Sequence, residues 1–239
     1  MLLLYYPFSF YRYFDPLYLG IAVFSLVIVF AAQGLVKSRY SKFSKILNMR
    51  GITGAEAAKA VLEANGVYGV NIEAVNGTLT DHYDPRNNTI RLSQDVYNST
   101  SIAAVGIASH EAGHAVQYAK KYVPIKLRTA ILPFARFGPM FGIILVAVGL
   151  MLNSLNLLIA GVALYGTVFV FQFVTLPVEF NASRRAMSAI RETNLLYGDE
   201  CDGAKKVLTA AALTYVAAML QSLLTLLYYC LRIFGGRRK

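Results

Sequence analysis

The stretch Ser109–His114 contains two histidines, His110 and His114, four positions apart, with Glu111 directly after the first. On a helix, residues four apart lie on the same face, so the two imidazoles can bind one metal ion. Glu111 then lies one step around the turn, beside the metal rather than on it. A carboxylate in that place can take a proton from a water molecule at the metal. The spacing therefore predicts a site for one catalytic Zn²⁺ ion.

The alternative is a chance match inside an ordinary core helix. The chain has only three histidines, however, and two of them belong to this motif. Burying such groups in a helix rich in alanine and glycine is also costly unless something pairs with them. Thr100 and Ser101 precede the apolar run that leads to His110, and either can serve as the N-cap of the helix. A genuine metal site on a helix is the better interpretation.

The composition is that of an integral membrane protein. Hydrophobic residues make up 56% of the 239 residues and charged residues only 15%, whereas soluble domains are about a quarter charged. The net charge of +10 would fit a nucleic-acid-binding protein, but the basic residues lie beside apolar runs, where charges set topology and face lipid. Nucleic acid is therefore not an expected partner. Cys201 and Cys230 lie far apart without metal-ligand spacing, which argues against a disulfide framework.

Four apolar runs are long enough to cross a bilayer, which takes about 20 residues. The first is Leu17–Val36, and the last is Val207–Leu231. Two more are expected at 131–152 and 155–177, joined by a tight turn without Lys or Arg. Because basic residues lie on both outer flanks of this hairpin, the positive-inside rule places the flanks in the cytoplasm and the turn outside. If the last run crosses, its basic tail lies outside, against the rule.

A polar segment between the first two runs is large enough for a small domain. Asn71–Val75 and Thr78–Tyr83 have the composition of strands and flank an Asn-Gly pair, the strongest hairpin signal in the segment. After another turn, Thr89–Ser93 is expected to form a third strand, and the metal-binding helix follows. An edge strand beside that helix can hold an extended peptide by strand addition.

A catalytic zinc site usually has three protein ligands and one open position. The third ligand is either the remaining histidine, His82, or a carboxylate. Glu179 is the favoured carboxylate because it follows Pro177 in the expected first turn of a helix, where the chain leaves the membrane. The hairpin starts just after the metal-binding helix and returns to the same membrane face, which brings Glu179 towards the histidines. A carboxylate in these apolar surroundings is costly without a partner, although a helix dipole alone also favours an acidic residue there.

Three blocks of the sequence resemble the bacterial YugP-like family of membrane zinc metallopeptidases. They are 77–86 (GTLTDHYDPR), 109–117 (SHEAGHAVQ) and 176–186 (LPVEFNASRRA), and the similarity covers nearly the whole chain. The layout is more distantly similar to that of HtpX-type and CAAX-prenyl membrane proteases. The resemblance implies that Glu179 is the third zinc ligand and that Ala182 takes the small position near it.

One position departs from the pattern of these relatives. Ser183 stands where they often carry an aspartate. A carboxylate that orients one of the ligand histidines would then have to come from elsewhere, and Asp81 and Asp95 are two candidates for it.

The expected fold is an α-helical integral membrane protein with about four transmembrane helices and a small α+β, zincin-like catalytic domain. We divide the chain into five segments, which are 1–36 (an interfacial lead-in and the first transmembrane helix), 37–130 (a cytoplasmic α+β metalloprotease domain with the metal-binding helix), 131–177 (a transmembrane hairpin), 178–203 (the third-ligand helix and an acidic turn) and 204–239 (the final transmembrane helix and basic tail).

The expected function is peptide-bond hydrolysis by a membrane-embedded zinc metalloprotease with Glu111 as general base. His82, also a catalytic candidate, Tyr83 and Arg184 are the candidates for stabilising the oxyanion. Expected partners are a peptide or membrane-protein substrate and the lipid bilayer, and a homo-oligomer is compatible with the sequence. The protein is expected in the plasma (inner) membrane as a multi-pass protein, with the active site on the cytoplasmic side.

Two other classes of protein compete with this interpretation. A membrane scaffold or chaperone-like protein would hold a structural zinc ion in a closed site, with His82 or Asp81 as the fourth ligand. A small channel or transporter is less favoured, because residues 137–178 contain no charged side chain and an ion pathway usually needs one.

Overall fold

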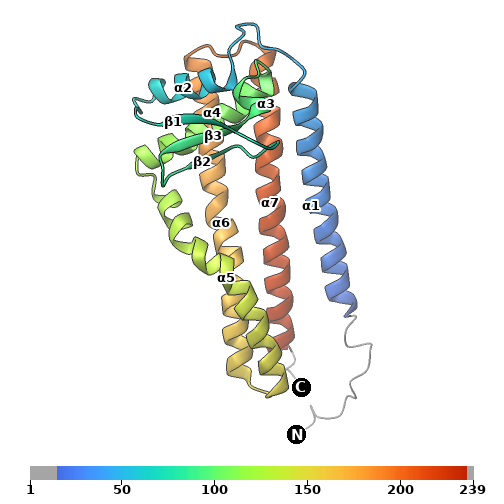
Figure 1. Cartoon of the computed structure of the whole chain (residues 1–239). Coiled ribbons are helices and arrows are strands. Elements are labelled where there is room, and N and C mark those ends of the chain that lie inside the picture. Colours follow the sequence, from blue (N-terminus) through green and yellow to red (C-terminus); the bar gives the residue numbers. More distant parts are fainter. Residues whose placement is uncertain (1–14, 236–239) are drawn as a thin grey trace.

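The computed structural model describes residues 15–235. The predicted lead-in before residue 15 and the last residues of the basic tail lie outside this range. Figure 1 shows long helices running side by side, with a small head at one end. In chain order the elements are α1 (Pro16–Phe43), α2 (Gly54–Ala64), β1 (Asn71–Val75), β2 (His82–Asp84), β3 (Thr89–Ser93), α3 (Gln94–Tyr97), α4 (Ile102–Ala119), α5 (Val123–Met151), α6 (Leu155–Glu192) and α7 (Asp199–Phe234).

Four helices, α1, α5, α6 and α7, are long and apolar enough to cross a membrane, as the sequence predicts. α1 packs on α7, α7 on α6 and α6 on α5. At the end away from the head, Nη2 of Arg232 lies 2.7 Å from Oδ2 of Asp15. This ion pair joins the end of α7 to the start of α1, so the last helix runs the full length of the bundle, antiparallel to the first (Figure 1).

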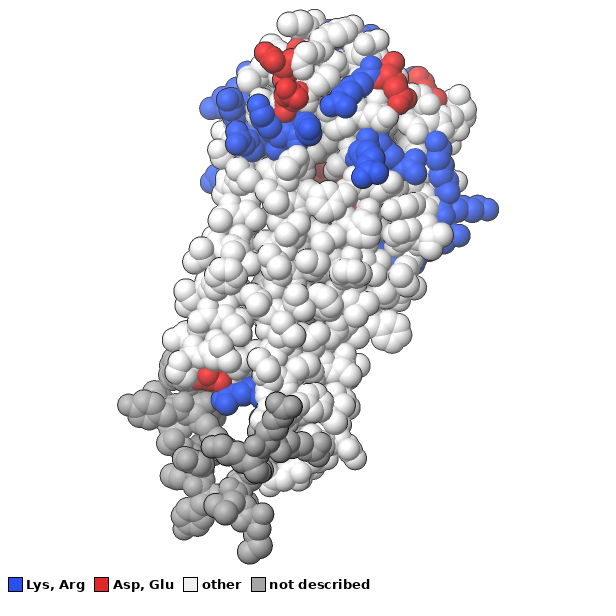
Figure 2. All heavy atoms as spheres, turned by 180° about the vertical axis from the view of Figure 1, so that it is seen from behind, with Lys and Arg blue, Asp and Glu red and all other residues white. Residues whose placement is uncertain are grey.

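The charged side chains lie mainly at the two ends of the molecule. On the face drawn in Figure 2, most Lys and Arg side chains gather on the head and where it meets the long helices, and the middle of the bundle is uncharged. An uncharged band of this kind is what the hydrocarbon core of a membrane requires. Both ends of the α5–α6 hairpin enter the head, which agrees with the prediction that its flanks share one side of the membrane.

The head contains a three-stranded sheet in the order β1-β3-β2, with β1 parallel and β2 antiparallel to β3. The predicted hairpin around Asn76-Gly77 is therefore wrong, because β3 lies between the two strands that it would join. β3 takes the central position because it carries fully buried Ile90 and Leu92, and burial of these side chains outweighs a local turn signal. The next turn does join β2 and β3 as predicted, although β2 begins at His82 rather than Thr78.

Helix boundaries near the membrane also differ from the prediction. α6 continues through Pro177 without a break, so Glu179 lies inside a helix and not in its first turn. Proline is tolerated inside long membrane helices because neighbouring groups satisfy the backbone that it frees. α1 runs on to Phe43, beyond the expected end of the first span. α7 begins at Asp199, so most of the predicted acidic turn is helix, whose dipole favours carboxylates in its first turn.

The motif helix α4 lies at the centre of the head. Ser101 caps it as predicted, because its Oγ accepts a hydrogen bond from the backbone N–H of Ala104 at 3.2 Å. α4 packs against α2, the sheet, α6 and α7, and Val105 and Val116 are fully buried in the core. The two motif histidines therefore stand on the most enclosed helix of the head.

A glycine allows α4 to approach α6 closely beside the motif. The Cβ of an alanine at Gly113 would lie 2.6 Å from the backbone oxygen of Ala182 on α6, closer than real side chains come. Gly113 therefore lets the two backbones touch next to His114. Ala182 occupies the small position that the family resemblance implies.

We expect Gly113→Ala to lower the free energy of unfolding by about 1–3 kcal/mol, because the added methyl group must force two packed helices apart. The matched control is Gly166→Ala on α6, whose Cβ would meet Leu226 at an ordinary 3.5 Å. Helix propensity alone should stabilise that variant by up to about 1 kcal/mol. Circular dichroism during thermal unfolding in detergent measures both changes. An unaltered unfolding temperature for Gly113→Ala would contradict the close contact.

Candidate metal centre

His110 and His114 on α4 and Glu179 on α6 each present one donor atom to the same small space. Nε2 of His110 lies 3.3 Å from Oε2 of Glu179, and Nε2 of His114 lies 3.5 Å from the same oxygen. Glu179 is only 2% exposed. Ligand atoms on a tetrahedral zinc ion, each about 2.0–2.1 Å from the metal, are about 3.3 Å apart. Two imidazoles and a carboxylate at this spacing therefore fit zinc.

The buried side chain of Gln117 determines which nitrogen of His114 is protonated. Nε2 of Gln117 donates to the backbone oxygen of Val178 at 2.7 Å and to Oδ1 of Asn181 at 3.0 Å. Its own oxygen therefore faces Nδ1 of His114, 3.0 Å away, and that nitrogen must donate. In the neutral ring, Nε2 then presents a lone pair to the Glu179 carboxylate. The Nε2 lone pair and the carboxylate oxygen are both hydrogen-bond acceptors and repel each other, so a cation between them is needed to stabilise this arrangement.

The electrostatics of His114 support the same conclusion. Burial lowers the pKa of its imidazole, but the hydrogen bond with Glu179 and the negative charges of Glu111 and Glu179 raise it more, so the net shift is upward. Without a metal ion, the imidazole of His114 thus binds a proton more readily than a free imidazole does. A metal ion would replace that proton when it binds.

Arg128 contacts the other oxygen of the third donor residue. Its Nη1, on α5, lies 3.5 Å from Oε1 of Glu179. The two carboxylate oxygens therefore have separate partners, with Oε2 facing the imidazoles and Oε1 facing the guanidinium. This division holds the carboxylate in one orientation, as groups around metal ligands commonly do.

Ser183 orients His110, the other histidine of the motif. Its Oγ lies 3.1 Å from Nδ1 of His110, which leaves Nε2 of that ring for a metal. The expected carboxylate partner for a ligand histidine is therefore wrong. Asp81 instead accepts hydrogen bonds from the N–H and the hydroxyl of Ser93, and Asp95 is exposed. Ser183 itself takes the place that the resemblance assigned to an aspartate, because it lies one helical turn after Glu179 and shares its face.

Glu111 lies beside the three donors and lines the same pocket. Its Oε2 accepts a hydrogen bond of 3.0 Å from the backbone N–H of Tyr83, which joins α4 to the edge strand β2. The Tyr83 hydroxyl donates to Oδ1 of Asn88, and its ring packs at a tilt against the ring of Tyr118. Only the backbone of Tyr83 therefore meets the site.

The structure does not bring His82 or Arg184 to the cluster. His82 is exposed, and its Nδ1 forms a 2.8 Å hydrogen bond with the backbone oxygen of Thr80. Its own loop thus holds the ring. Arg184 is exposed on α6. It follows Ser183 directly, and one step along a helix turns a side chain by about 100° away from its neighbour.

His110 and Glu179 line a cavity of about 220 Å³ that α1, α4, α6 and α7 enclose. Tyr215 on α7 lines this cavity together with Glu111 and Glu179. Its hydroxyl lies within electrostatic range of Glu179, Glu111 and Arg128. Tyr215 is thus a phenol that the described structure places in the cavity of the candidate metal centre, whereas the sequence offers Tyr83.

Two of the residues that the prediction missed, Tyr215 and Gln117, do have sequence signals. Tyr215 is the only aromatic residue between 207 and 219, in a run of small and aliphatic residues. Gln117 follows His114 by three positions, so it shares the metal-binding face of the helix. Arg128 has no comparable signal, because other basic residues surround it in the sequence.

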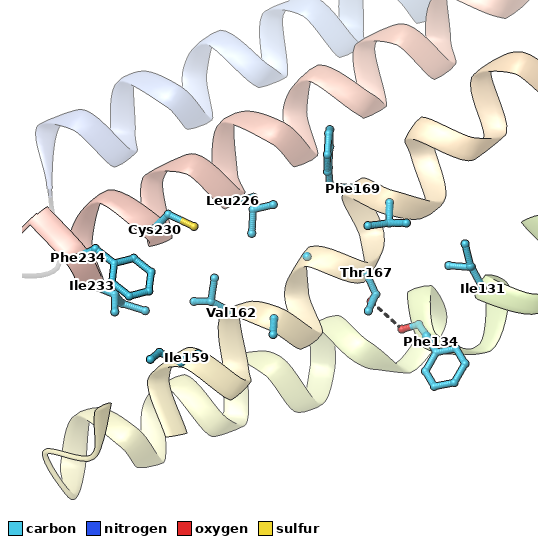
Figure 3. Close-up of a pocket in the computed structure, with 13 residues that line it drawn as sticks. Ile131, Phe134, Ile159, Val162, Thr167, Phe169, Leu226, Cys230, Ile233 and Phe234 are labelled. Carbon is cyan, nitrogen blue, oxygen red and sulfur yellow. Dashed lines mark hydrogen bonds between the residues drawn. The ribbon is translucent and has the colours of Figure 1, made fainter. Parts of the chain in front are cut away.

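A second, larger cavity of about 500 Å³ lies among α5, α6 and α7, and Figure 3 shows its lining. The side chains are almost all apolar, and Thr167 uses its hydroxyl to donate to the backbone oxygen of Phe134 across the two helices of the hairpin. No carboxylate or imidazole is among the residues that line it. The smaller cavity is therefore the candidate site for metal chemistry.

We expect Gln117→Met to weaken zinc binding about 10–100-fold, the usual cost of removing a group that orients a metal ligand. Methionine preserves the volume but cannot accept the proton of His114. Competition with a chromophoric chelator measures the affinity of the purified protein. The matched control is Gln94→Met at an exposed position on α3, which should bind zinc as the wild type does. Equal affinities for both variants would show that Gln117 does not orient the site.

Comparisons with known proteins identify the family of the chain. Residues 18–234 match the family described as "Putative neutral zinc metallopeptidase". The chain is 45% identical over 221 residues to a protein named "Putative membrane protease YugP" from Bacillus subtilis (strain 168), a match that covers 92% of this chain and 98% of that protein. No solved structure matches the chain. Its length, its membrane helices and the match across both motif regions show that the chain belongs to the family of "Putative neutral zinc metallopeptidase" proteins.

Proposed function

We propose that this membrane protein is a zinc-dependent peptidase that hydrolyses peptide bonds. The observation that carries the proposal is the convergence of His110, His114 and Glu179 beside Glu111, at the wall of a cavity. Three protein donors with one side open are typical of catalytic zinc sites. When bound, zinc would polarise a carbonyl group and lower the pKa of a water molecule to about 7.

Glu111 is the proposed general base. Its Oε2 is held by the Tyr83 N–H, which fixes the carboxylate in one rotamer and leaves Oε1 to receive the proton. The same group then passes the proton to the leaving amine. The carboxylate lies outside the trio of metal donors, so it remains a base when the metal is bound.

Tyr215 is the proposed stabiliser of the negative charge on the reacting carbonyl oxygen. Arg128 already faces Oε1 of Glu179, so the ligand has an orienting partner without Tyr215. A phenol that borders both Glu111 and Glu179 in the cavity is placed to donate a hydrogen bond to the substrate.

A zincin-like catalytic domain is the proposed role of the head, and two features support it. The strand β2 lies at the edge of the sheet and contacts α4 through Tyr83 and Glu111. An extended substrate can pair with such an edge. The basic residues at the base of the head (Figure 2) support a cytoplasmic position in the plasma membrane.

A non-catalytic scaffold with a structural zinc ion is less well supported. Its site would be closed by a fourth protein ligand, and His82 and Asp81 were the two candidates. In the described structure His82 contacts Thr80 and Asp81 contacts Ser93. The open donor set thus favours the peptidase.

Glu111→Gln should keep its zinc but lose at least about 100-fold in kcat, because the amide cannot take a proton. His110→Ala should lose the metal as well as the activity. Metal analysis of the detergent-purified protein, together with cleavage of a peptide library, measures both properties in the same samples. Full activity of Glu111→Gln would exclude Glu111 as the base.

Tyr215→Phe should retain zinc affinity and lower kcat by about 100–1,000-fold, the usual effect of removing one oxyanion donor. Its affinity for a phosphinic peptide, which imitates the tetrahedral transition state, should fall by a similar factor. Tyr229→Phe, farther along the same helix and packed on Tyr165, is the control. If Tyr215→Phe instead weakens zinc binding and leaves inhibitor affinity of the loaded enzyme unchanged, then Tyr215 only positions Glu179.

A further inference from the structure

The cavity beside the metal centre has an apolar wall that the proposed chemistry does not use. The wall is formed by Val36 on α1, Ile107 on α4, Val207 and Ala211 on α7, and Leu79 in the connection between β1 and β2. None of these side chains can bind a metal ion or move a proton. An apolar surface next to reactive groups stabilises an apolar part of a ligand, because contact between them removes apolar area from water.

Leu79 provides an independent indication that the wall is functional. Its φ is +56°, in the left-handed region, which is sterically unfavourable for a residue with a side chain such as leucine. Glycine would adopt this conformation without the steric cost. Leu79 is 46% exposed and lies outside the hydrophobic core of the head. Because the leucine side chain does not serve that core, its contribution is to the cavity that it lines.

The size and charge of the cavity limit what it can hold. Its volume of about 220 Å³ is below the roughly 300–1,000 Å³ of pockets that enclose whole small molecules, and suits one large side chain. No Lys or Arg lines it, while Asp81, Glu111 and Glu179 do. An acidic side chain would meet like charges there. A basic side chain is not required, because Asp81 already accepts a hydrogen bond from Ser93 and Glu179 already faces Arg128.

We propose that this wall is a side-chain pocket that selects peptides with a large aliphatic or aromatic residue next to the scissile bond. The inference rests on the proposed peptidase function and names its substrate class. Val36 directly precedes the basic residues that end the first apolar run, and Ala211 lies on the last membrane helix. The pocket is therefore built where two membrane helices enter the head, and accepts apolar peptide segments at the membrane surface.

Zinc-loaded, full-length protein in detergent can be tested with peptides that differ only in the residue next to the scissile bond, which is Leu, Phe, Ala or Asp. The wild type should cleave the Leu and Phe peptides with kcat/KM at least about 10-fold above the Ala and Asp peptides. Ala211→Leu fills the pocket and should remove this preference, mainly by raising KM for the large residues. Thr209→Leu, exposed on the same helix, should leave the preference unchanged.

Peptide binding gives a second measurement that does not depend on turnover. In zinc-loaded Glu111→Gln, fluorescence anisotropy should show at least about 10-fold tighter binding of the Leu peptide than of the Asp peptide. Adding Leu79→Ala, a change outside the core, should reduce that ratio several-fold at unchanged zinc affinity.

The outcomes separate the two proposals. Selective binding of the Leu peptide without cleavage by the wild type would support the pocket and contradict the peptidase function. The pocket would be overturned if peptides were cleaved or bound with no preference for large apolar residues. It would also be overturned if that preference survived both Ala211→Leu and Leu79→Ala. Failure of every peptide to bind would overturn it as well.

Discussion

A buried carboxylate that faces two imidazole nitrogens is the constraint on which the rest of this structure depends. Burying one ionised carboxylate costs several kcal/mol even after the protein relaxes. Glu179 is almost fully buried, and Oε2 lies against Nε2 of both histidines. Because Gln117 requires the proton of His114 to be on Nδ1, the facing nitrogen is an acceptor. A divalent cation resolves this conflict, and the donor types and spacing match those of zinc.

The fold assembles this centre by returning a membrane hairpin to the helix that precedes it. α5 leaves the head just after α4, and α6 comes back with Glu179 well inside a continuous helix. Gly113 lets α4 and α6 touch, and Gln117 hydrogen-bonds across that contact. The membrane helices are therefore part of the site and not only its anchor. α1 and α7 continue this arrangement, because they enclose the cavity that His110 and Glu179 line.

The sequence predicted the site best where one local pattern indicated both the type of chemistry and the positions of the side chains. The spacing of His110 and His114 implied a shared helix face, and the return of the hairpin pointed to Glu179 although its place within a helix was wrong. The strand order could not be read locally, because an Asn-Gly pair is a signal between neighbours while the burial of β3 depends on the whole head. Tyr83 is a sequence candidate because its strand can flank the cleft, and Arg184 is expected behind it, but neither side chain reaches the site. Tyr215, which lines the cavity, lies on a helix far from the motif in sequence. Which of its residues face the cavity depends on how this helix packs against the others, and a local pattern does not give that.

The central claim is that the two histidines and Glu179 hold one zinc ion with a position open to solvent. X-ray absorption at the zinc edge of the purified, zinc-loaded protein tests this claim most directly, combined with metal stoichiometry. We expect one zinc ion per chain, with two imidazole nitrogens and oxygen ligands at about 2.0–2.1 Å and no sulfur, and an oxygen ligand lost in the Glu179→Ala variant. A site closed by four protein ligands, or a spectrum unchanged by that substitution, would contradict the account.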